Sequence, residues 1–460
     1  MAVQFKEKII VAGAGPVGCL LATLLARRGM EVEVYEKRPD LRRASLAGGR
    51  SINLVLTDRG LRALRRLGLN EPVQELTVPV LGRMMHSIEG ELAYQPYGKD
   101  DSEHNHSVSR GELNKFLLDA AEEAGVVIHF EHPITGADFE AQKLVVQPPT
   151  GSPKQVPFHV VLGCDGAPSA IRQALVDAGH ADAQVSFMQW GYKELLFPAG
   201  PDGDYRAAGH ALHIWPRGAH FLMALANLDG SFTGTLYMPT TGPQSFEALD
   251  DPAKIEAFFT NYYPDAIELL GDYAEELLAH PTGMLGTVRC ATWHLDDRVL
   301  LLGDAAHGIV PFFGQGLNSG FEDCTVFDEL LDKEDSMADL FARFFERRKP
   351  NADAIADMAL ENAVEMGEKV ADPNFLLRKK VEAKIEQHMP EIYRSRYAMV
   401  MYSHIPYAKA FALGEVQQTL LSTLTADLDD AEDLDLDHAR QLIEERFSPE
   451  VERLGVDLHF

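Results

Sequence analysis

The feature that most constrains the fold is a glycine-rich turn close to the start of the chain. A short apolar strand, Lys8 to Val11, leads into Gly13-Ala-Gly15-Pro-Val-Gly18, and an apolar helix is expected from Cys19 to Arg28. In this G-x-G-x-x-G pattern the first glycine permits a tight turn, and the second lets backbone amides approach a pyrophosphate. The third allows the helix to pack closely on the strand. The pattern therefore predicts a Rossmann-like α/β unit that binds a dinucleotide.

An acidic residue follows at the distance that this pattern requires. A second strand, Glu31 to Tyr35, ends at Glu36, about 20 residues after the glycines. Its carboxylate can bind both ribose hydroxyls of an adenosine and would repel a 2′-phosphate, so FAD or NAD is favoured over NADP as the bound nucleotide. A glycine turn without a ligand is the competing interpretation, and the agreement of strand, helix and acid disfavours it.

A second fragment combines a buried strand with an acid. The apolar run Val160 to Gly163 predicts a strand that stops at Asp165-Gly166, and Ser169 and Arg172 follow at helical spacing. An acid at the carboxyl end of a strand suits a ligand rich in hydroxyl groups.

A third fragment repeats this arrangement almost 300 residues after the glycine turn. The run Val299 to Leu302 predicts an interior strand that stops at Gly303-Asp304. A loop containing Pro311-Phe-Phe-Gly-Gln-Gly316 follows, and a helix is expected to begin near Leu317 or Asn318. A glycine-rich helix start offers free N–H groups to a ligand with partial negative charge.

These three fragments, in this order and at these separations, resemble the flavoprotein aromatic hydroxylases, the single-component FAD monooxygenases. The resemblance implies that FAD is bound, that Asp304 binds the ribityl chain, and that the helix near Asn318 points its positive end at the flavin N1–C2=O edge. Arg110, after a strand and at a helix start, is similar to the flavin arginine of the family. The expected cofactor-binding residues are Gly13, Gly15, Val17, Gly18, Glu36, Lys37, Arg38, Arg50, Val55, Arg110, Ile134, Asp165, Ala170, Asp304, Gly316, Leu317 and Asn318.

Further segments resemble the kynurenine-hydroxylating branch of this family, over nearly the whole chain to about residue 415. They are Gly49–Leu54, Gly82–Ser87, Gln95–Gly98, Ser107–Asn114, Leu212–Pro216, Val310–Gly316, Met358–Met366 and Arg396–Val400. The resemblance implies hydroxylation of L-kynurenine to 3-hydroxykynurenine with NADPH and O2, through a flavin C4a-hydroperoxide. We assign no residue as a catalytic acid or base.

The substrate side can also be argued from chemistry. An amino-acid substrate needs a cation for its carboxylate, which Arg83 offers as a bidentate fork and Tyr97 can supplement with a hydrogen bond. Asn362, Glu365, Met366 and Lys369 share one face of a predicted helix. On pattern alone that face is a solvated surface, but the resemblance favours a ligand role for Asn362 and, less firmly, for Glu365. It also assigns Arg83, Tyr97 and Tyr397 to kynurenine. The expected apolar walls are Leu212, Leu225, Tyr237, Phe312, Phe313 and Met366, although core packing could equally explain most of these six.

Composition limits the partners and the compartment. With 460 residues, 46% of them hydrophobic, the chain can bury a large core, and a net charge of −28 argues against nucleic acid or an anionic membrane as partner. The four cysteines show no metal or redox spacing, so they are interpreted as buried residues in a reducing cytoplasm. Histidines 86, 104 and 106 lack further ligands at suitable spacing, so no metal is expected. The acidic stretch Asp427–Asp437 stands where mitochondrial members continue into a hydrophobic anchor, which indicates a soluble, bacterial-type member without a membrane anchor.

We expect an α/β chain with several domains. The FAD-binding domain is predicted to be discontinuous, over residues 1–75, 100–180 and 285–360. A substrate-binding domain, over residues 76–99 and 181–284, is predicted to be an antiparallel sheet with strands at 210–216, 220–226 and 231–238. Residues 361–460 are predicted to be helical and to act as a lid. A homodimer is compatible with the resemblance, and the sequence does not decide it.

Three alternatives stay open. A hydroxylase of another, salicylate-like aromatic acid would keep the flavin motifs without needing Arg83, Tyr97 and Asn362 together. A flavin-dependent halogenase would carry a W-x-W-x-I-P signature, which this chain lacks. A non-catalytic nucleotide-binding regulator would yield a colourless protein, whereas an FAD enzyme would be yellow.

Overall fold

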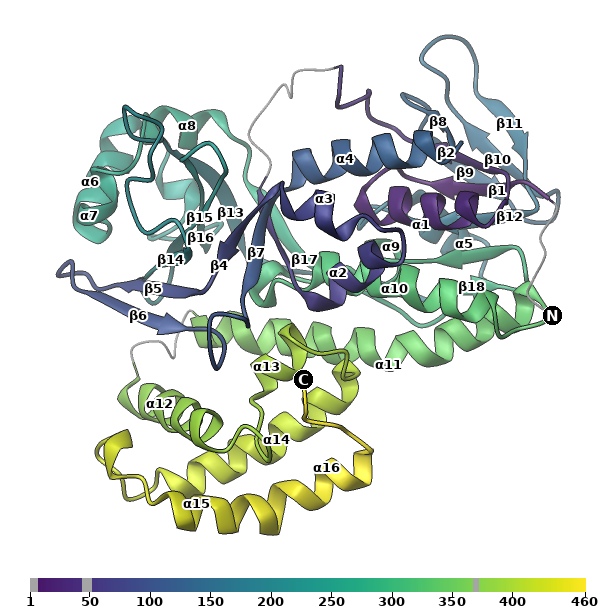
Figure 1. The fold of residues 1–460 in the computed structure, drawn as a ribbon. Helices are drawn as coiled ribbons and strands as arrows, with labels where there is room; N and C mark the ends of the chain where they lie inside the picture. Colours follow the sequence, from purple (N-terminus) through teal and green to yellow (C-terminus); the bar gives the residue numbers. More distant parts are fainter. Residues whose placement is uncertain (1–6, 44–51, 367–371) are drawn as a thin grey trace.

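A six-stranded sheet lies in the right-hand part of the molecule as drawn in Figure 1. The computed structural model describes residues 7–43, 52–366 and 372–460. The strand order is β18 (His294–Leu295), β19 (Val299–Leu301), β12 (Val160–Gly163), β1 (Ile9–Ala12), β2 (Val32–Tyr35) and β8 (Val127–His129). From β19 to β8 neighbouring strands are parallel, so their carboxyl ends meet at one edge of the sheet.

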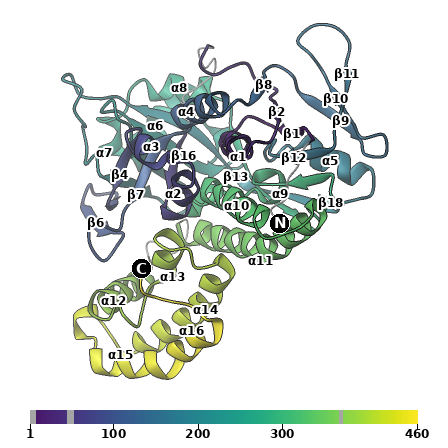
Figure 2. The same cartoon turned by 45° about the vertical axis from the view of Figure 1, so that its right-hand side comes forward.

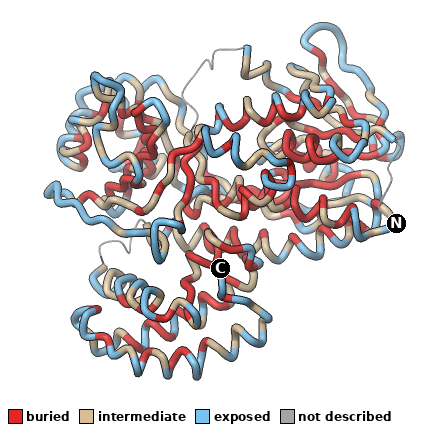
Figure 3. The backbone as a smooth tube through the Cα atoms, viewed as in Figure 1, coloured by how far each residue is buried: buried red, intermediate tan, exposed pale blue. Residues whose placement is uncertain are grey.

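Helices and a small sheet pack against this sheet in one hydrophobic core, which explains why its strands are continuous apolar runs rather than alternating ones. β1 and β12 are buried at every position. The helices of this part are α1 (Pro16–Arg27), α2 (Asp58–Arg65), α3 (Asn70–Gln74), α4 (Arg110–Glu123), α5 (Ala170–Asp177), α9 (Asp304–His307) and α10 (Gly316–Leu331). Figure 3 shows the buried backbone concentrated in this sheet and in the helices against it.

A seven-stranded sheet forms the second layer of the molecule, at the left of Figure 1. Its order is β17 (Gly283–Cys290), β13 (Ala183–Phe197), β16 (Phe232–Pro239), β15 (Phe221–Ala226), β14 (Ala211–Pro216), β5 (Gly82–His86) and β6 (Leu92–Pro96). Neighbouring strands are antiparallel except β14 and β5, which are parallel. The three strands predicted at 210–216, 220–226 and 231–238 are thereby confirmed, each shifted by one residue at its start.

The two faces of this sheet bury different partners. Trp215 and Leu222 pack in one core with residues of α6 (Pro252–Tyr262), α7 (Pro264–Ile267) and α8 (Tyr273–Ala279). Phe221 and Tyr237 project to the other face, where they join a core with Phe312 and the carboxyl-terminal helices. This second face therefore packs against the segment that precedes α10.

Two three-stranded sheets complete the strands. β3 (Asn53–Leu56), β7 (Asn105–Ser109) and β4 (Thr77–Val80) form one of them, with β7 in the middle. β11 (Lys154–Pro157), β10 (Lys143–Val146) and β9 (Ile134–Asp138) form the other. Because β5 and β6 follow β4 directly, the chain passes from the first small sheet into the seven-stranded sheet and back into β7.

The last part of the described chain is helical, as predicted. The long helix α11 (Met337–Val364) separates it from the sheets, and the remaining helices lie beyond α11 in both views (Figures 1 and 2). They are α12 (Pro373–His388), α13 (Arg396–Met401), α14 (Tyr407–Leu424), α15 (Leu436–Leu442) and α16 (Ser448–Leu454). No helix within residues 7–43, 52–366 and 372–460 is both long and apolar enough to cross a membrane.

Some element boundaries differ from the sequence predictions. The segment after β19 is not one loop, since it contains the short helix α9 and a 3-10 turn at Pro311–Phe313. Helix α10 begins at Gly316, one residue before the predicted start. Helix α11 ends at Val364, so Glu365 and Met366 lie in a wider turn after it. Arg50 and Lys369 lie outside the described residues.

Candidate active site

The three glycines of the turn differ in the room around them: a side chain would clash at two of the positions and would meet open space at the third. Gly13 has φ +93°, and a Cβ there would lie 2.6 Å from the carbonyl oxygen of Cys164. A Cβ on Gly18 would lie 2.0 Å from the carbonyl oxygen of Gly13. A Cβ on Gly15 would meet no protein atom within 4 Å. Gly13 and Gly18 are therefore required by the fold, whereas Gly15 keeps open the space that a pyrophosphate would need.

Glu36 presents a buried, ionised carboxylate beside this turn. It is 4% exposed, and its Oε2 accepts from the backbone N–H of Ala14 at 2.7 Å. Its Oε1 accepts from the backbone N–H and from Nε of Arg38, at 2.9 and 2.8 Å. Burial alone would raise the pKa of Glu36, but the Arg38 guanidinium and these N–H groups together lower it. A ribose can bind this carboxylate where Arg38 now does.

Two helices at this edge of the sheet begin without a cap. α1 and α10 have neither a capping side chain nor an acidic residue in the first turn, whereas α4, α5 and α11 are capped by serine side chains. In α10 the first helical hydrogen bond runs from the backbone N–H of Ser319 to the carbonyl of Gln315. The N–H groups of Gly316, Leu317 and Asn318 precede it and are available to an anionic or carbonyl ligand edge.

Asp304 is an exposed acid in buried surroundings. It begins α9, and the three residues after it, Ala305, Ala306 and His307, are buried. Gly303 before it adopts φ 56° and ψ −143°, a conformation essentially confined to glycine. The carboxylate thus faces away from the core at the end of β19, where a ribityl chain could bind it.

A buried ionic network holds the Gly303–His307 segment in place. Asp323 accepts from the backbone N–H of Gly303 at 2.8 Å, from His307 Nε2 at 2.7 Å and from Arg348 Nε at 2.6 Å. Burial would raise the pKa of Asp323, but His307 and Arg348 lower it to about 2. From the other side, Arg172 Nη1 donates to the carbonyl of Ala305 at 2.9 Å.

Two residues predicted to bind the cofactor use their side chains in hydrogen bonds within the protein. Asn318 accepts from Thr57 N–H at 2.9 Å and donates to the carbonyls of Val55 and Gly314, at 2.8 and 3.0 Å. Asp165 accepts from Ser169 Oγ at 2.5 Å and from Ala170 N–H at 2.7 Å. A cofactor contact of Asn318 is therefore expected from its backbone N–H, and one of Asp165 remains a prediction.

The remaining predicted cofactor residues lie around the same edge or beside it. Val17 packs against Gly303 and Gly320, and Val55 against Gly314. Lys37 is exposed after β2, and Ile134 begins β9 two residues after His132, whose N–H donates to the carbonyl of Glu36. Ala170, Leu317 and Arg110 are the first or second residues of α5, α10 and α4.

Three predicted substrate residues form one row across the seven-stranded sheet. Arg83 on β5 pairs with Leu212 on β14. The β14–β15 register places Leu225 opposite Leu212, because His213 pairs with Ala224. Side chains of directly opposed residues share a face. Phe221 projects to that face from β15, so Arg83, Leu212 and Leu225 line the face that meets Phe312.

Arg83 lies beside two phenols. Its guanidinium carbon is 5.5 Å from the ring centre of Tyr97, and the rings of Tyr97 and Tyr397 are stacked with centres 5.2 Å apart. Burial raises the pKa of both phenols, so both keep their protons at neutral pH. Among the described residues, none forms an ion pair with Arg83. The arrangement offers a cation and hydroxyl donors to a carboxylate from outside the chain.

The loop before α10 supplies aromatic surface. Phe312 lies 5.3 Å from the ring of Tyr237, and Phe313 lies 6.3 Å from that of Tyr397. Asn362 Nδ2 donates to the carbonyl of Phe312 at 2.5 Å and to Met366 Sδ at 3.7 Å. The structure thus brings most of the predicted substrate residues to one region, and Glu365 follows the end of α11 beside them.

Sequence reasoning missed several polar residues here. Asn105 Nδ2 donates to the hydroxyl of Tyr397 at 2.9 Å. Gln315 accepts from Tyr407 Oη at 2.7 Å and donates to Met401 Sδ at 3.0 Å. These contacts join residues that are 86 to 292 positions apart, so no local sequence pattern could predict them.

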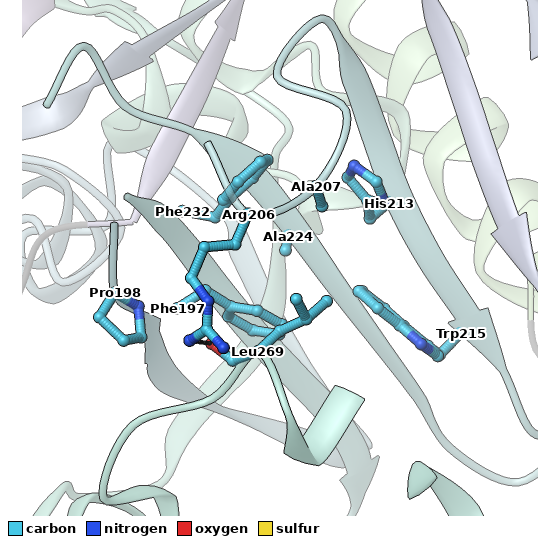
Figure 4. A pocket seen from close by; sticks show the side chains of 9 residues that line it. All are labelled: Phe197, Pro198, Arg206, Ala207, His213, Trp215, Ala224, Phe232 and Leu269. Atoms are coloured by element: carbon cyan, nitrogen blue, oxygen red, sulfur yellow. Dashed lines mark hydrogen bonds between the residues drawn. The ribbon is translucent and has the colours of Figure 1, made fainter. Parts of the chain in front are cut away.

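A small pocket lies on the opposite face of the seven-stranded sheet (Figure 4). It is lined by Phe197, Pro198, Arg206, Ala207, His213, Trp215, Ala224, Phe232 and Leu269. His213 there accepts from or donates to His86 at 2.8 Å, and His86 contacts Asp265 at 2.8 Å. Successive side chains of β14 point to opposite faces of the sheet, so the sheet separates this pocket from Leu212. No group of three potential metal ligands occurs in the described parts of the chain.

Comparisons with known proteins were consistent with this geometry. The family model described as an FAD binding domain matches residues 6–359. A protein of Myxococcus xanthus named kynurenine 3-monooxygenase is 50% identical over 446 residues, covering 96% of each chain. The chain belongs to the kynurenine 3-monooxygenase family. Another relative of that name, from Stenotrophomonas maltophilia, is 40% identical and covers 95% of this chain and 96% of its own.

Solved structures agree at the level of the fold. 2-Methyl-3-hydroxypyridine-5-carboxylic acid oxygenase superposes with a TM-score of 0.66 at 20% identity, covering 81% of this chain and 96% of that one. Klebsiella pneumoniae HpxO, solved with FAD and uric acid, has a TM-score of 0.62 at 19% identity, with 80% and 90% covered. The kynurenine 3-monooxygenase family thus shares its fold with other FAD-dependent proteins. The open space at Gly15, the uncapped start of α1 and the buried Glu36 fit FAD.

Proposed function

We propose that the chain hydroxylates L-kynurenine to 3-hydroxykynurenine. One O2 and one NADPH with a proton are consumed, and water and NADP⁺ are released. The observation that carries the proposal is Arg83, a half-buried guanidinium beside the phenols of Tyr97 and Tyr397 that forms no ion pair with any residue the structure describes. In a chain of net charge −28, a cation kept free of carboxylates points to an anionic ligand.

Arg83 binds the substrate carboxylate in this proposal, and Tyr97 and Tyr397 donate hydrogen bonds to it. Asn362 and Glu365 orient the rest of the amino-acid portion. The aromatic ring lies against an apolar wall made by Leu212, Leu225, Tyr237, Phe312, Phe313 and Met366. Anchoring the carboxylate at one end fixes which ring carbon faces the cofactor.

FAD, when bound, accepts electrons from NADPH and activates O2. The uncapped start of α10 stabilises negative charge at the flavin edge, and the apolar wall excludes water from the reacting atoms. The substrate's own aniline nitrogen activates the ring carbon ortho to it, so no protein base is required for attack. The chain therefore contributes binding, orientation and exclusion of water.

NADPH is the proposed reductant and binds transiently, because the sequence contains no second glycine fingerprint. We propose the domain division stated above: a discontinuous FAD-binding domain, a sheet that covers the substrate, and a carboxyl-terminal lid. We also propose a cytoplasmic location and a homodimer. Fractionation of the native host and light scattering of the purified protein test these two points.

The proposal is tested by NADPH oxidation with a panel of aromatic acids. L-Kynurenine is expected to accelerate oxidation and to yield 3-hydroxykynurenine. Acceleration by salicylate-like acids, with none by kynurenine, would overturn the substrate and keep the flavin enzyme. A colourless protein without FAD would overturn both.

A further inference from the structure

Asn105 links the strand β7 to the phenol cluster of the proposed substrate site. Its side chain is buried, with 3% exposed, and its Nδ2 donates to the hydroxyl oxygen of Tyr397 at 2.9 Å. Tyr397 lies in α13, almost 300 residues later in the chain. Buried polar groups are normally hydrogen-bonded, and this bond holds the Tyr397 hydroxyl in one position.

The direction of this hydrogen bond follows from the other half of the amide. Asn105 Oδ1 is buried and has no partner among the described residues. In the present orientation one N–H of the amide is paired, whereas the reversed amide would leave both of its N–H groups without a partner among the described residues. The N–H group therefore faces Tyr397, whose oxygen accepts. A phenol that accepts in this way keeps its single proton for another acceptor.

Three phenols meet at this point, so the direction of each proton matters. Tyr97 stacks on Tyr397, and Tyr402 lies edge-on to it with ring centres 6.2 Å apart. Burial raises the pKa of all three, so each carries one proton to donate. Tyr397 also forms side-chain hydrogen bonds with Tyr97 and Tyr402. With Asn105 donating to its oxygen, Tyr397 acts as the donor in its other contacts, and a substrate carboxylate is a stronger acceptor than either phenol.

The distance between β7 and α13 is fixed by a neighbouring buried ion pair. Arg394, three residues before Tyr397, donates through Nη2 to Glu103 Oε1 at 2.6 Å and through Nε to Glu386 at 2.9 Å. Arg394 is 1% exposed and Glu103 7%. Since Glu103 lies two residues before Asn105, the two contacts hold the same segments together.

We propose that Asn105 is a positioning residue, which directs the hydroxyl proton of Tyr397 toward the substrate carboxylate. The inference rests on the proposed function, in which Arg83, Tyr97 and Tyr397 bind that carboxylate. Asn105 itself need not touch the substrate. It orients the Tyr397 hydroxyl so that the Arg83 guanidinium and the Tyr397 O–H both donate to one carboxylate.

The test compares two ligands on the FAD-loaded full chain. L-Kynurenine carries the carboxylate, and its decarboxylated amine, kynuramine, does not. Asn105→Leu should raise the Kd for kynurenine about tenfold, as for one lost hydrogen bond to a charged group, and change that for kynuramine less than about twofold. Asn105→Asp keeps the volume and, when ionised, can only accept, so above the pKa of the new carboxyl, found from the pH dependence of binding, it should weaken kynurenine binding at least as much. In a Tyr397→Phe background, Asn105→Leu should cause no further loss.

The opposite results would overturn the role. Equal losses for both ligands, wild-type kynurenine affinity in Asn105→Asp with its carboxyl ionised, or a full further loss in the Tyr397→Phe background would each show that Asn105 only fills space. If Asn105→Leu fails to retain FAD, the isosteric Asn105→Asp decides by the same criteria. A wild-type protein that binds kynurenine no better than kynuramine would refute the carboxylate site of the proposed function itself, before any variant is measured.

Discussion

The guanidinium of Arg83 is the residue-scale feature on which substrate binding depends most. Arg83→Met removes the charge and keeps an apolar stem of similar length. We expect the Kd for kynurenine to rise about a hundredfold, as for a lost charge-assisted pair, while FAD stays bound. Fluorescence titration of the holoenzyme measures it.

Arg206→Met is the matched control for this change. Arg206 lies at the pocket on the other face of the same sheet and donates to the carbonyl of Leu269. It should leave kynurenine affinity unchanged. Unchanged affinity in Arg83→Met as well would remove Arg83 from the substrate site.

Glu36→Ala addresses the cofactor at the same scale. The substitution removes the acceptor for ribose hydroxyls and also releases the N–H of Ala14. FAD content after purification should fall, while the remaining holoenzyme binds kynurenine normally. Glu33→Ala, on the same strand but paired with Lys8 and Tyr35, is the control and should keep its FAD. Full FAD occupancy in Glu36→Ala would refute the ribose role.

At the scale of elements, the glycine turn separates a requirement of the fold from a requirement of the ligand. Gly15 has φ −72°, and a Cβ there meets nothing within 4 Å. Gly15→Ala should therefore leave the free energy of unfolding of the FAD-free protein unchanged or raise it by up to about 1 kcal/mol. FAD affinity should nevertheless fall at least about tenfold, because the methyl group occupies the space for the pyrophosphate.

Gly18→Ala should affect both the fold and cofactor binding. Its Cβ would lie 2.0 Å from the carbonyl oxygen of Gly13, so unfolding free energy and FAD affinity should both fall. Chemical denaturation and FAD titration of the two variants measure the contrast. Normal FAD binding by Gly15→Ala would place the pyrophosphate elsewhere.

Local elements were predictable from the sequence, and contacts between distant elements were not. The β1–turn–α1 unit and the strands β14 to β16 follow from hydrophobic period and from glycine placement, which act over a few residues. Asn105, Gln315 and Arg348 act through partners far along the chain, and their neighbours in sequence carry no signal of this. Asn318 shows both cases. The sequence motif identified its position, but its side-chain bonds to Val55 and Thr57 could be seen only in the folded structure.

Whole-molecule stability should depend on pH through three buried histidines. Burial lowers the pKa of His106, His213 and His220 to about 4 each. In the unfolded chain they titrate near 6.5, so between pH 6.5 and 4 the unfolded state binds more protons than the folded state. The free energy of unfolding should therefore fall as pH drops through this window, by roughly 1 kcal/mol per pH unit for each histidine, and the histidine contribution should level off near pH 4.

Urea denaturation at several pH values checks this, with His220→Gln as a comparison that should reduce the slope. Asp323 adds to this fall only at the acid end of the window, because its carboxyl stays ionised in the folded protein, with a pKa of about 2, whereas in the unfolded chain it begins to bind protons below about pH 5. Stability that is constant from pH 6.5 to 4.5 would contradict the neutral, buried state of these rings.

The most direct test of the function follows oxygen into the product. Purified holoenzyme is given L-kynurenine and NADPH under isotopically labelled O2, and the product is analysed by mass spectrometry. We predict 3-hydroxykynurenine carrying one labelled oxygen atom on the ring carbon ortho to the aniline nitrogen. Unchanged kynurenine, or a hydroxyl group without the label, would contradict the proposed hydroxylation.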